Sequence, residues 1–307
     1  MARQGRRQPA EHRRKPFPWR QRVQEGLRAA RAAVRRLAPR AGQRVVAGRE
    51  AGYRPWDPEV IGVDTATERA ILAALNRGGI RGTLLSEEAG ETTMAGRSAR
   101  AGAGSEPVYV IMDPFDGSLL YRRGIPAHWF SALAIYGQDG QPRAAGVTDH
   151  LTGEIILAEP AGVVRIPRPG ARPVPVHPAR TASLDGAFLE TYLKKPPYLY
   201  AMATALRPLF ERAKFILGNG GPYGFADVAC GRIDVYFGWN EALTEVFSAI
   251  YIAERAGCVV TQWDGSPIRF RPDIHAVYSL VCSANLRLHA EVLQSLKGIP
   301  PPKGLMP

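Results

Sequence analysis

One segment constrains the fold of this chain more than any other: Asp-Pro-Phe-Asp-Gly-Ser at residues 113–118. It follows an apolar run at 108–112, rich in β-branched and aromatic residues, which predicts a buried strand. Asp113 and Asp116 cannot both face one side of a regular strand, but a turn at the proline and the glycine lets their carboxylates converge. Converging carboxylates repel one another unless a cation lies between them, and hard oxygen ligands suit Mg²⁺ or Mn²⁺. In isolation, such a segment is more often a solvated turn.

Two further segments place acidic residues where elements begin or end. The apolar stretch at 82–85 predicts a strand that runs into Ser-Glu-Glu at 86–88. Glu245 opens a segment whose apolar residues recur at helical spacing as far as Gly257, and a strand is expected at 259–260. An acid at a helix start is ordinarily only a favourable partner of the helix dipole. The three segments together indicate a shared acidic site.

The three segments resemble the signatures of the Mg²⁺-dependent, lithium-sensitive phosphatases, a superfamily that includes inositol monophosphatases and fructose-1,6-bisphosphatases. The third signature corresponds to the stretch from Glu254 to Gly265. Supporting stretches lie in the expected order at 146–154, 228–236 and 282–285, so that the resemblance covers roughly residues 20–298. It implies an α-β-α-β-α sandwich of five layers, hydrolysis of phosphate monoesters and a homodimer.

Two positions depart from most inositol monophosphatases. Thr244-Glu245 stands in place of their Trp-Asp, and a glutamate there resembles the fructose-bisphosphatase branch, which also tends to carry a serine such as Ser118 after the Asp-Gly. Glu68 stands where the family has an aspartate that helps to activate water. Archaeal members with dual activity have instead an aspartate before a Thr pair, which Asp64 resembles. Either acid can serve.

The resemblance implies a set of metal ligands. Glu87 and Asp113, with the carbonyl of Phe115, are expected to hold a first Mg²⁺. Asp113, Asp116 and Glu245 are expected to hold a second, in a site that takes two or three Mg²⁺ ions or, alternatively, Mn²⁺. Divalent ions held by carboxylates neutralise an anionic ester and make water a better nucleophile, which is what hydrolysis of a phosphate monoester requires.

Water activation and substrate binding involve other residues. Ser118, hydrogen-bonded to Asp64 or Glu68, is expected to orient the attacking water, and the backbone N–H groups of Gly117 and Ser118 are expected to hold the phosphate. Lys214 leads a strand into a glycine-rich turn that contains Gly218 and Asn219, and such a turn can approach a sugar or an anion closely. Further candidates are Lys194, Lys195, Tyr198, Arg122 and Arg123.

Composition is consistent with a cytoplasmic enzyme that acts on a small-molecule phosphate ester. At 307 residues and 45% hydrophobic content the chain can bury a large core, and no run of about 18 apolar residues predicts a membrane span. The three cysteines, Cys230, Cys258 and Cys282, lack the spacing of zinc ligands and are expected to be buried thiols. The basic N-terminus has no following apolar core, so it does not read as a secretory signal.

The basic charge is concentrated near the N-terminus. Residues 1–40 carry 13 Lys and Arg against two Glu, out of a net charge of +12, so the rest of the chain is nearly neutral and nucleic-acid binding is not expected. Residues 1–18 are expected to form a disordered basic tail. The apolar residues Val23, Leu27, Ala30, Val34 and Leu37 predict one stripe of a helix that ends near Pro39 and docks on the body.

A proline-rich stretch divides the remainder. We expect an α+β subdomain with the metal motifs at 19–166, a connection at 167–180, an α/β subdomain at 181–298 and a tail at 299–307, with the site between the subdomains. In the second subdomain, helices are expected at 200–212, 222–230, 241–256 and 285–296.

Three classes of function compete on the sequence alone. The favoured one is a Mg²⁺-dependent phosphatase for a small polyol or sugar phosphate, with inositol monophosphate first and fructose 1,6-bisphosphate or a nucleoside 3′,5′-bisphosphate as alternatives. The others are a non-catalytic regulator that keeps the fold and an RNA-binding protein that uses the basic tail. Retention of Glu87, Asp113 and Asp116 disfavours the regulator, and the nearly neutral body disfavours RNA binding.

Overall fold

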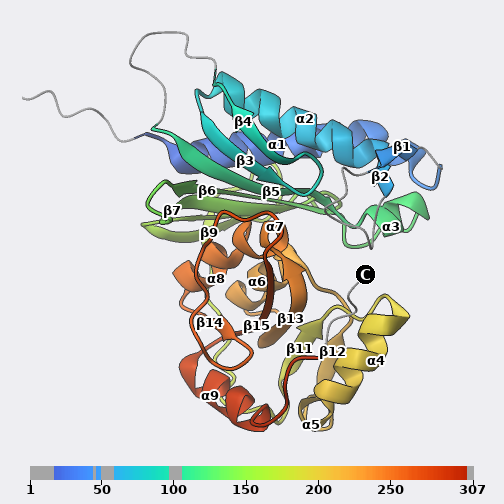
Figure 1. The fold of residues 1–307 in the computed structure, drawn as a ribbon, viewed down its shortest axis with the longest axis vertical. Helices are drawn as coiled ribbons and strands as arrows, with labels where there is room; N and C mark the ends of the chain where they lie inside the picture. The colour runs from blue at the N-terminus through green and yellow to red at the C-terminus, as the bar shows by residue number, and fades with distance from the viewer. Residues whose placement is uncertain (1–16, 44–45, 50–58, 97–105, 303–307) are drawn as a thin grey trace, which may run out of the picture.

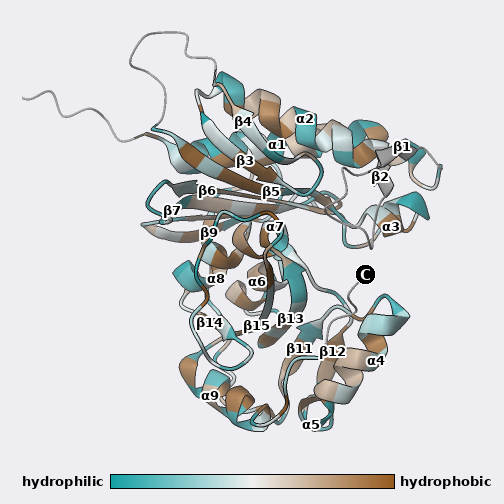
Figure 2. Cartoon of the chain, viewed as in Figure 1, coloured by the Kyte–Doolittle hydropathy of each residue, from teal (hydrophilic) through white to brown (hydrophobic). Residues whose placement is uncertain are grey.

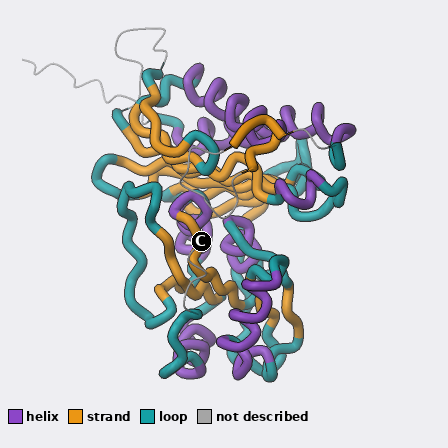
Figure 3. Tube along the Cα trace, turned by 45° about the vertical axis from the view of Figure 1, so that its right-hand side comes forward, coloured by secondary structure: helices purple, strands orange, loops and turns teal. Residues whose placement is uncertain are grey.

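The structure, a computed structural model, describes residues 17–43, 46–49, 59–96 and 106–302. Two β-sheets alternate with three layers of helices, so that the predicted α-β-α-β-α sandwich is confirmed (Figure 1). The same layers are visible as purple helices and orange strands after a 45° turn in Figure 3. No helix among the described residues is long and apolar enough to cross a membrane.

The larger sheet belongs to the first half of the chain. Its strand order is β10-β9-β8-β7-β6-β5-β3-β4, and all neighbouring strands are antiparallel except β3 and β5. Its strands are β3 (Gly82–Ser86), β4 (Gly90–Met94), β5 (Val108–Asp116), β6 (Phe130–Gly137), β7 (Pro142–Asp149), β8 (Ile155–Glu159), β9 (Gly162–Ile166) and β10 (Val174–Pro175). A separate pair, β1 (Val46–Arg49) and β2 (Glu59–Ile61), precedes it.

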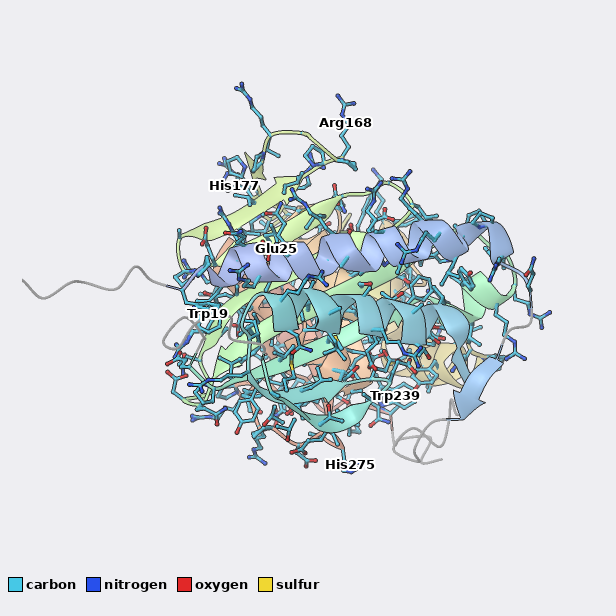
Figure 4. The ribbon with its side chains drawn as sticks, turned by 90° about the horizontal axis from the view of Figure 1, so that it is seen from above. Trp19, Glu25, Arg168, His177, Trp239 and His275 are labelled. Carbon is cyan, nitrogen blue, oxygen red and sulfur yellow. The ribbon has the colours of Figure 1, made fainter. Side chains whose placement is uncertain are left out.

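Two long helices, α1 (Trp19–Leu37) and α2 (Gly62–Arg77), cover the outer face of the larger sheet. Seen from above in Figure 4, they lie side by side across the strands. Val23, Leu27, Ala30 and Val34 of α1 are buried, which confirms the predicted stripe and its docking on the body. The helix ends at Leu37, and a single 3₁₀ turn, η1 (Ala38–Arg40), follows.

The smaller sheet belongs to the second half and has the order β12-β11-β13-β15-β14. Its strands are β11 (Phe188–Thr191), β12 (Phe215–Leu217), β13 (Val235–Ala242), β14 (Val259–Gln262) and β15 (Val277–Ser283). The strands β12, β11 and β13 are parallel, so their carboxyl ends lie at one edge. The outer helices are α4 (Pro196–Ala205), α5 (Arg207–Phe210) and α9 (Leu286–Ser295).

The middle layer lies between the sheets and consists of α6 (Pro222–Ala229), α7 (Leu243–Phe247) and α8 (Ile250–Ala256). Every residue of α6 is buried, because both sheets pack against it. Apolar residues accordingly predominate around the helix, as its brown colour in Figure 2 shows. The short helix α3 (Ser118–Arg122) lies apart from this layer, directly after β5.

Several predicted boundaries were wrong, each for a local reason. The helix expected at 241–256 is two short helices, because residues 241 and 242 still pair with β15 as part of β13 and the chain turns again at residues 248–249. The helix expected at 200–212 begins at Pro196 and breaks at Leu206, since Pro208 lacks the N–H that a continuing helix requires. The turn expected after residue 112 is part of β5, which runs to Asp116.

The proline-rich connection and the two predicted tails differ in how much of them the structure describes. The proline-rich connection contributes β10, which pairs with β9 at the edge of the larger sheet. Residues 1–16 of the predicted tail and residues 303–307 lie outside the described residues. Phe17 packs against Trp19, with ring centroids 4.4 Å apart, so the described chain begins as part of the body.

Candidate active site

A cavity of about 790 Å³ lies between the two halves of the molecule, and both halves contribute to its walls. Its volume falls within the usual range for small-molecule sites. The first half contributes residues at the ends of β3 and β5 and in α3, and the second contributes residues that follow β11, precede α6 and end β13. The acidic residues among them are Glu87, Asp113, Asp116, Glu241 and Glu245.

An irregularity in β5 brings two of these acids to the cavity. Asp113 pairs with Ala132 and Asp116 with Phe130, so that two residues of β5 lie opposite Ser131 alone. Such a bulge redirects side chains that a regular strand would send to opposite faces. Asp113 is buried, and its Oδ1 accepts a hydrogen bond of 3.1 Å from the Phe115 N–H. The convergence expected from a turn is thus produced by a bulged strand.

The turn after β5 requires glycine at position 117. Gly117 has φ +108°, and a Cβ atom there would lie 2.0 Å from the carbonyl oxygen of His128. A side chain would therefore displace the chain that carries Ser118 into α3. Ser118 Oγ lies 2.7 Å from Asp64 Oδ1 and 3.1 Å from the Phe115 carbonyl oxygen. Its one proton can be donated to either of them.

Of the two acids that the sequence left open, the structure pairs Asp64 with Ser118. Asp64 is buried in the first turn of α2. Glu68, one turn later, accepts hydrogen bonds from the Ser86 hydroxyl and from the Ala89 N–H at 3.1 Å, and it does not line the cavity. Burial raises the pKa of Glu68, and these two hydrogen bonds partly offset that rise. Glu68 therefore fixes the turn that carries Glu87.

Glu87 reaches the site because β3 is parallel to β5. The Glu87 N–H donates to the Met112 carbonyl at 3.2 Å and so extends the pairing of the two strands. Carboxyl ends of parallel strands meet at one edge of a sheet, which places Glu87 beside Asp113. Glu87 and Asp113 are both buried and both line the cavity.

Glu245 has two roles at once. Its Oε2 accepts a hydrogen bond of 2.9 Å from the Ala242 N–H, as expected of an acid in the first turn of a helix. It also lines the cavity, next to Glu241, a buried residue whose Oε1 accepts from the Tyr236 hydroxyl at 3.1 Å. Burial raises the pKa of Glu241 well above its usual range, and the charge of Glu245 raises it further.

The carboxylates that line the cavity are oxygen donors, which is the kind of ligand that a hard divalent cation prefers. Burial and then neighbouring carboxylates, including Asp116, raise the pKa of Glu190 and Glu241, so a positive charge placed in the cavity would relieve mutual repulsion. Oxygen donors alone favour Mg²⁺ or Mn²⁺. Within the described part of the chain, no three His, Cys, Asp or Glu residues come together closely enough to hold an ion. Binding would therefore require these side chains to turn towards one another.

Cationic and aromatic residues form the other walls. Lys194 Nζ donates to Asn219 Oδ1 at 2.6 Å, and Asn219 Nδ2 donates to Oε1 of the fully buried Glu190 at 3.0 Å. Lys195, Arg122 and Arg123 also line the cavity. Tyr198 lies between Tyr192 and Trp239, with ring centroids 5.1 Å away on either side in edge-to-face contact. The three rings line the cavity as well.

Comparison with known proteins finds relatives in sequence and in fold. No family model matches the chain. The Nus factor SuhB of Xylella fastidiosa is 27% identical over 208 residues, which are 66% of this chain and 69% of that protein. The fructose-1,6-bisphosphatase/inositol-1-monophosphatase of Methanothermobacter thermautotrophicus is 26% identical over 249 residues, 77% of this chain and 83% of that protein.

Solved structures agree in fold. The inositol monophosphatase of Anabaena has a TM-score of 0.68 at 20% identity, covering 92% of this chain and 96% of that one. The inositol monophosphatase of Thermotoga maritima has a TM-score of 0.69 at 19% identity, covering 91% and 98%. The chain is thus similar in sequence and in fold to inositol monophosphatases and fructose-1,6-bisphosphatases. The relatives that carry these names are phosphatases, that is, phosphoric monoester hydrolases.

Within this superfamily fold, the predicted site residues divide into two groups. Those that line the cavity are Glu87, Asp113, Phe115, Asp116, Gly117, Ser118 and Glu245, and Asp64 touches it through Ser118. Glu68, Gly218, Asn219 and Lys214 do not line it. Lys214 precedes β12, at the opposite end of the strand from the cavity, and lies over the Phe188 ring at 6.0 Å. Asn219 lies behind the wall and holds Lys194.

Several cavity residues were not among the predictions, and the aromatic and polar ones among them are Tyr192, Trp239, Asn240 and Glu241. The last three end β13, where two residues lie opposite Ser279 alone and Asn240 has φ +56°. The sequence carries one sign of this bulge, namely that the polar pair Asn240 and Glu241 follows directly on the apolar run of β13.

Proposed function

We propose that the chain hydrolyses the phosphate monoester of a small polyol or sugar, with Mg²⁺ as its cofactor and inositol monophosphate as the first substrate to test. The observation that carries this proposal is the Ser118 hydroxyl, bonded to buried Asp64 in a cavity that also contains Glu87 and Asp113. A hydroxyl paired with a buried acid can pass on a proton, and such general-base assistance contributes about 10²- to 10⁴-fold to a rate.

The metal ligands we propose are the carboxylates of Glu87, Asp113, Asp116 and Glu245 and the carbonyl of Phe115. Two or three Mg²⁺ ions, or Mn²⁺, bound there would supply positive charge for the phosphate and lower the pKa of water. The protein would hold this positive charge through carboxylates that lie at the ends of β3 and β5. Glu87 and Asp113 are buried, and a buried carboxylate is costly unless hydrogen bonds or a cation compensate its charge.

Ser118 and Asp64 act on the attacking water in this proposal. Ser118 Oγ accepts a proton from the water while it donates its own to Asp64 Oδ1, along the 2.7 Å bond that the two side chains form. The water oxygen then attacks phosphorus, the bond from phosphorus to the ester oxygen breaks, and the departing alkoxide takes a proton from solvent and leaves as the alcohol. The backbone N–H groups of the 117–118 turn are proposed to hold the phosphate oxygens.

A second candidate is a substrate that carries another anionic group. Four cationic residues line the same cavity, and they are Arg122, Arg123, Lys194 and Lys195. An inositol monophosphate has no second phosphate for them, whereas fructose 1,6-bisphosphate or a nucleoside 3′,5′-bisphosphate does. Lys194 is the best placed of the four, because Asn219 fixes its ammonium group from behind.

The test is release of inorganic phosphate from a panel of these esters, each measured with Mg²⁺ and with excess EDTA. We expect hydrolysis only with the metal, and the ester with the highest kcat/KM identifies the substrate class. A chain that hydrolyses none of them under either condition would refute the proposal and favour the non-catalytic alternative. Hydrolysis that continues at full rate in EDTA would refute the metal requirement alone.

A further inference from the structure

The described chain ends in a stiff segment. Residues 299–302 are Ile-Pro-Pro-Pro and follow α9 after a short turn, in which the Ile299 N–H donates to the Leu296 carbonyl at 2.8 Å. Each proline fixes its own φ, and each residue that precedes a proline is driven to extended conformations. Such a run favours the polyproline II helix, which has three residues per turn and leaves its carbonyl groups without internal partners.

Two tryptophans hold this proline run by its carbonyl groups. The Trp263 indole N–H donates to the Ile299 carbonyl at 3.0 Å, and the Trp239 indole N–H donates to the Pro302 carbonyl at 2.9 Å. The two acceptors are three residues apart, which is one turn of polyproline II, so they face the same side of the run. Aromatic grooves recognise proline-rich peptides in the same way between proteins. Here the ligand and the groove belong to one chain.

Trp239, which holds the Pro302 carbonyl, is also part of the cavity wall. Trp239 lies in the bulge of β13, is 4% exposed, and lines the cavity together with Asn240 and Tyr198. The backbone of Asn240 is left-handed, with φ +56°, a conformation that asparagine adopts more readily than most residues other than glycine. The Asn240 N–H donates to Ser279 Oγ at 3.2 Å, and the bond to Pro302 holds the neighbouring ring. In Figure 1 the chain leaves α9, crosses the smaller-sheet half and reaches the side on which α4 lies.

We propose that the proline run at 299–302 is a strap that fixes Trp239 in the cavity wall and makes Trp239 a specificity-determining residue. This inference deepens the proposed function and rests on it. Trp239 presents a rigid aromatic surface, which suits the apolar C–H face of a sugar or cyclitol ring. The strap supplies the only acceptor seen for its indole N–H among the described residues, so that the ring would lose its orientation without it.

Loss of the strap should weaken substrate binding and spare the chemical step. The strap and Trp239 belong to the small-sheet wall, whereas Ser118 and Asp64 belong to the larger-sheet half. For Trp239→Phe, which keeps a ring and loses the N–H donor, we expect KM to rise about five- to tenfold with kcat within about twofold. Trp263→Phe is the comparison variant: it removes the strap's other hydrogen bond but leaves the bond from Trp239 to Pro302, and its ring does not line the cavity, so KM should rise less than in Trp239→Phe.

A truncation tests the strap itself. A chain that ends at Gly298 should reproduce the rise in KM, and adding Trp239→Phe to it should cause no further rise, because both changes break the same hydrogen bond. A chain that ends at Pro302 keeps the strap and should match the full-length chain. Unchanged KM in the Gly298 chain, or a loss already present in the Pro302 chain, would overturn the proposal.

Hydrogen exchange separates this proposal from the proposed function. Mass spectrometry of peptides that cover β13 should show faster amide exchange around residues 239–241 in the Gly298 chain than in the Pro302 chain. If the full-length chain hydrolyses no ester, the proposed function fails while this exchange difference still supports the strap. Equal exchange in the two truncated chains would show that the proline run does not hold Trp239.

Discussion

At the scale of single residues, the site depends on which acid meets Ser118. Asp64 accepts its hydroxyl at 2.7 Å, whereas Glu68 is held by Ser86 and by the backbone of residue 89. The two acids lie one helical turn apart in α2, and that turn directs them to different partners. Asp64 is therefore the proposed catalytic acid, whereas Glu68, four residues later, fixes the turn after β3.

This difference gives the first prediction. Asp64→Asn should lower kcat about 10²- to 10⁴-fold, because an amide oxygen is a poor acceptor of the proton that Ser118 passes on. Glu68→Gln should keep kcat near the wild-type value, since an amide can still accept from Ser86 and the Ala89 N–H. Steady-state kinetics of the two variants check the assignment, and the reverse order of activities would transfer the role to Glu68.

Glu245 carries the second prediction, because it is one of the two positions at which the sequence differs from the pattern of most inositol monophosphatases. Glu245→Gln should keep the fold, since the amide can still accept from the Ala242 N–H, but it removes the charge proposed to hold a cation. We expect a large loss of Mg²⁺ affinity and turnover. Glu245→Asp should give reduced activity that excess Mg²⁺ restores, because Mg²⁺ tolerates little change from ligand distances of about 2.0–2.1 Å.

The measurement is a Mg²⁺ titration of turnover for the two variants and the wild type. Wild-type turnover of Glu245→Gln with an unchanged Mg²⁺ requirement would leave Glu245 only its role at the start of α7.

At the scale of elements, the site is built from irregularities in otherwise regular strands. The bulges in β5 and β13 bring Asp116 and Glu241 to the cavity, and the glycine turn after β5 places Ser118 against Asp64. Bulges are frequent beside functional sites because they redirect side chains without interrupting the sheet. The cavity therefore lies where the ladders of the two sheets are disturbed.

The third prediction compares two glycines of positive φ. Gly117 has φ +108° and meets the His128 carbonyl, whereas Gly257 has φ +96°, ends α8, and has no atom within 4 Å of the position that a Cβ would take. Gly257→Ala should cost about 1 kcal/mol, from backbone conformation alone. Gly117→Ala should cost more, because the backbone must also move, and it should abolish turnover by displacing Ser118. Thermal unfolding and activity of both variants check this, and equal losses of stability would show that the 117–118 turn adapts.

The sequence predicted the acids at the ends of β3 and β5 better than it predicted the cavity wall that the second half of the chain contributes. Glu87, Asp113 and Asp116 follow apolar runs, so their position at strand ends could be inferred from local pattern. The break between α7 and α8 could not, because it depends on the pairing of residues 241 and 242 with β15, which is distant in the sequence. Lys214 was expected in the site, but β12 runs parallel to β11 and β13, so the residue before β12 lies at the end away from the cavity.

At the scale of the whole molecule, an ion-pair network around the buried carboxylate of Glu154 joins the two halves that enclose the cavity. Glu154, between β7 and β8, accepts from the Tyr223 hydroxyl of α6 at 2.9 Å, from Arg165 at 3.2 Å and from Arg232. Arg232 also donates to Asp227 at 3.0 Å. Glu154 and Asp227 are buried, but 34% of the Arg232 side-chain surface is exposed, so solvent screens part of the attraction. We infer that this network holds the halves in the register that the site requires.

Two buried histidines give the fourth prediction, which concerns pH. Burial lowers the pKa of His150 to about 3 and that of His289 to about 4, so both rings stay neutral in the folded chain while an unfolded histidine titrates near 6.5. The stability they contribute is present above about pH 6.5 and is lost as the pH falls towards the folded values, by up to about 1.4 kcal/mol per pH unit for each ring.

The melting temperature should therefore fall between about pH 6.5 and pH 5, and the fall should be shallower for His289→Gln than for the wild type. Thermal unfolding across this range checks the slope. Identical slopes for the two chains would show that His289 gains its proton without unfolding.

We propose that the acids at the end of β5 hold a divalent cation for phosphate hydrolysis. Phosphate release by the wild type and by Asp113→Asn, each at saturating ester and over a range of Mg²⁺ concentrations, tests it most directly. We predict activity of the wild type only with Mg²⁺ or Mn²⁺, and a loss of at least about 100-fold in Asp113→Asn that added metal does not restore, because Asp113 is proposed to contact both ions. Turnover of Asp113→Asn at the wild-type rate, or full wild-type turnover in excess EDTA, would contradict the claim.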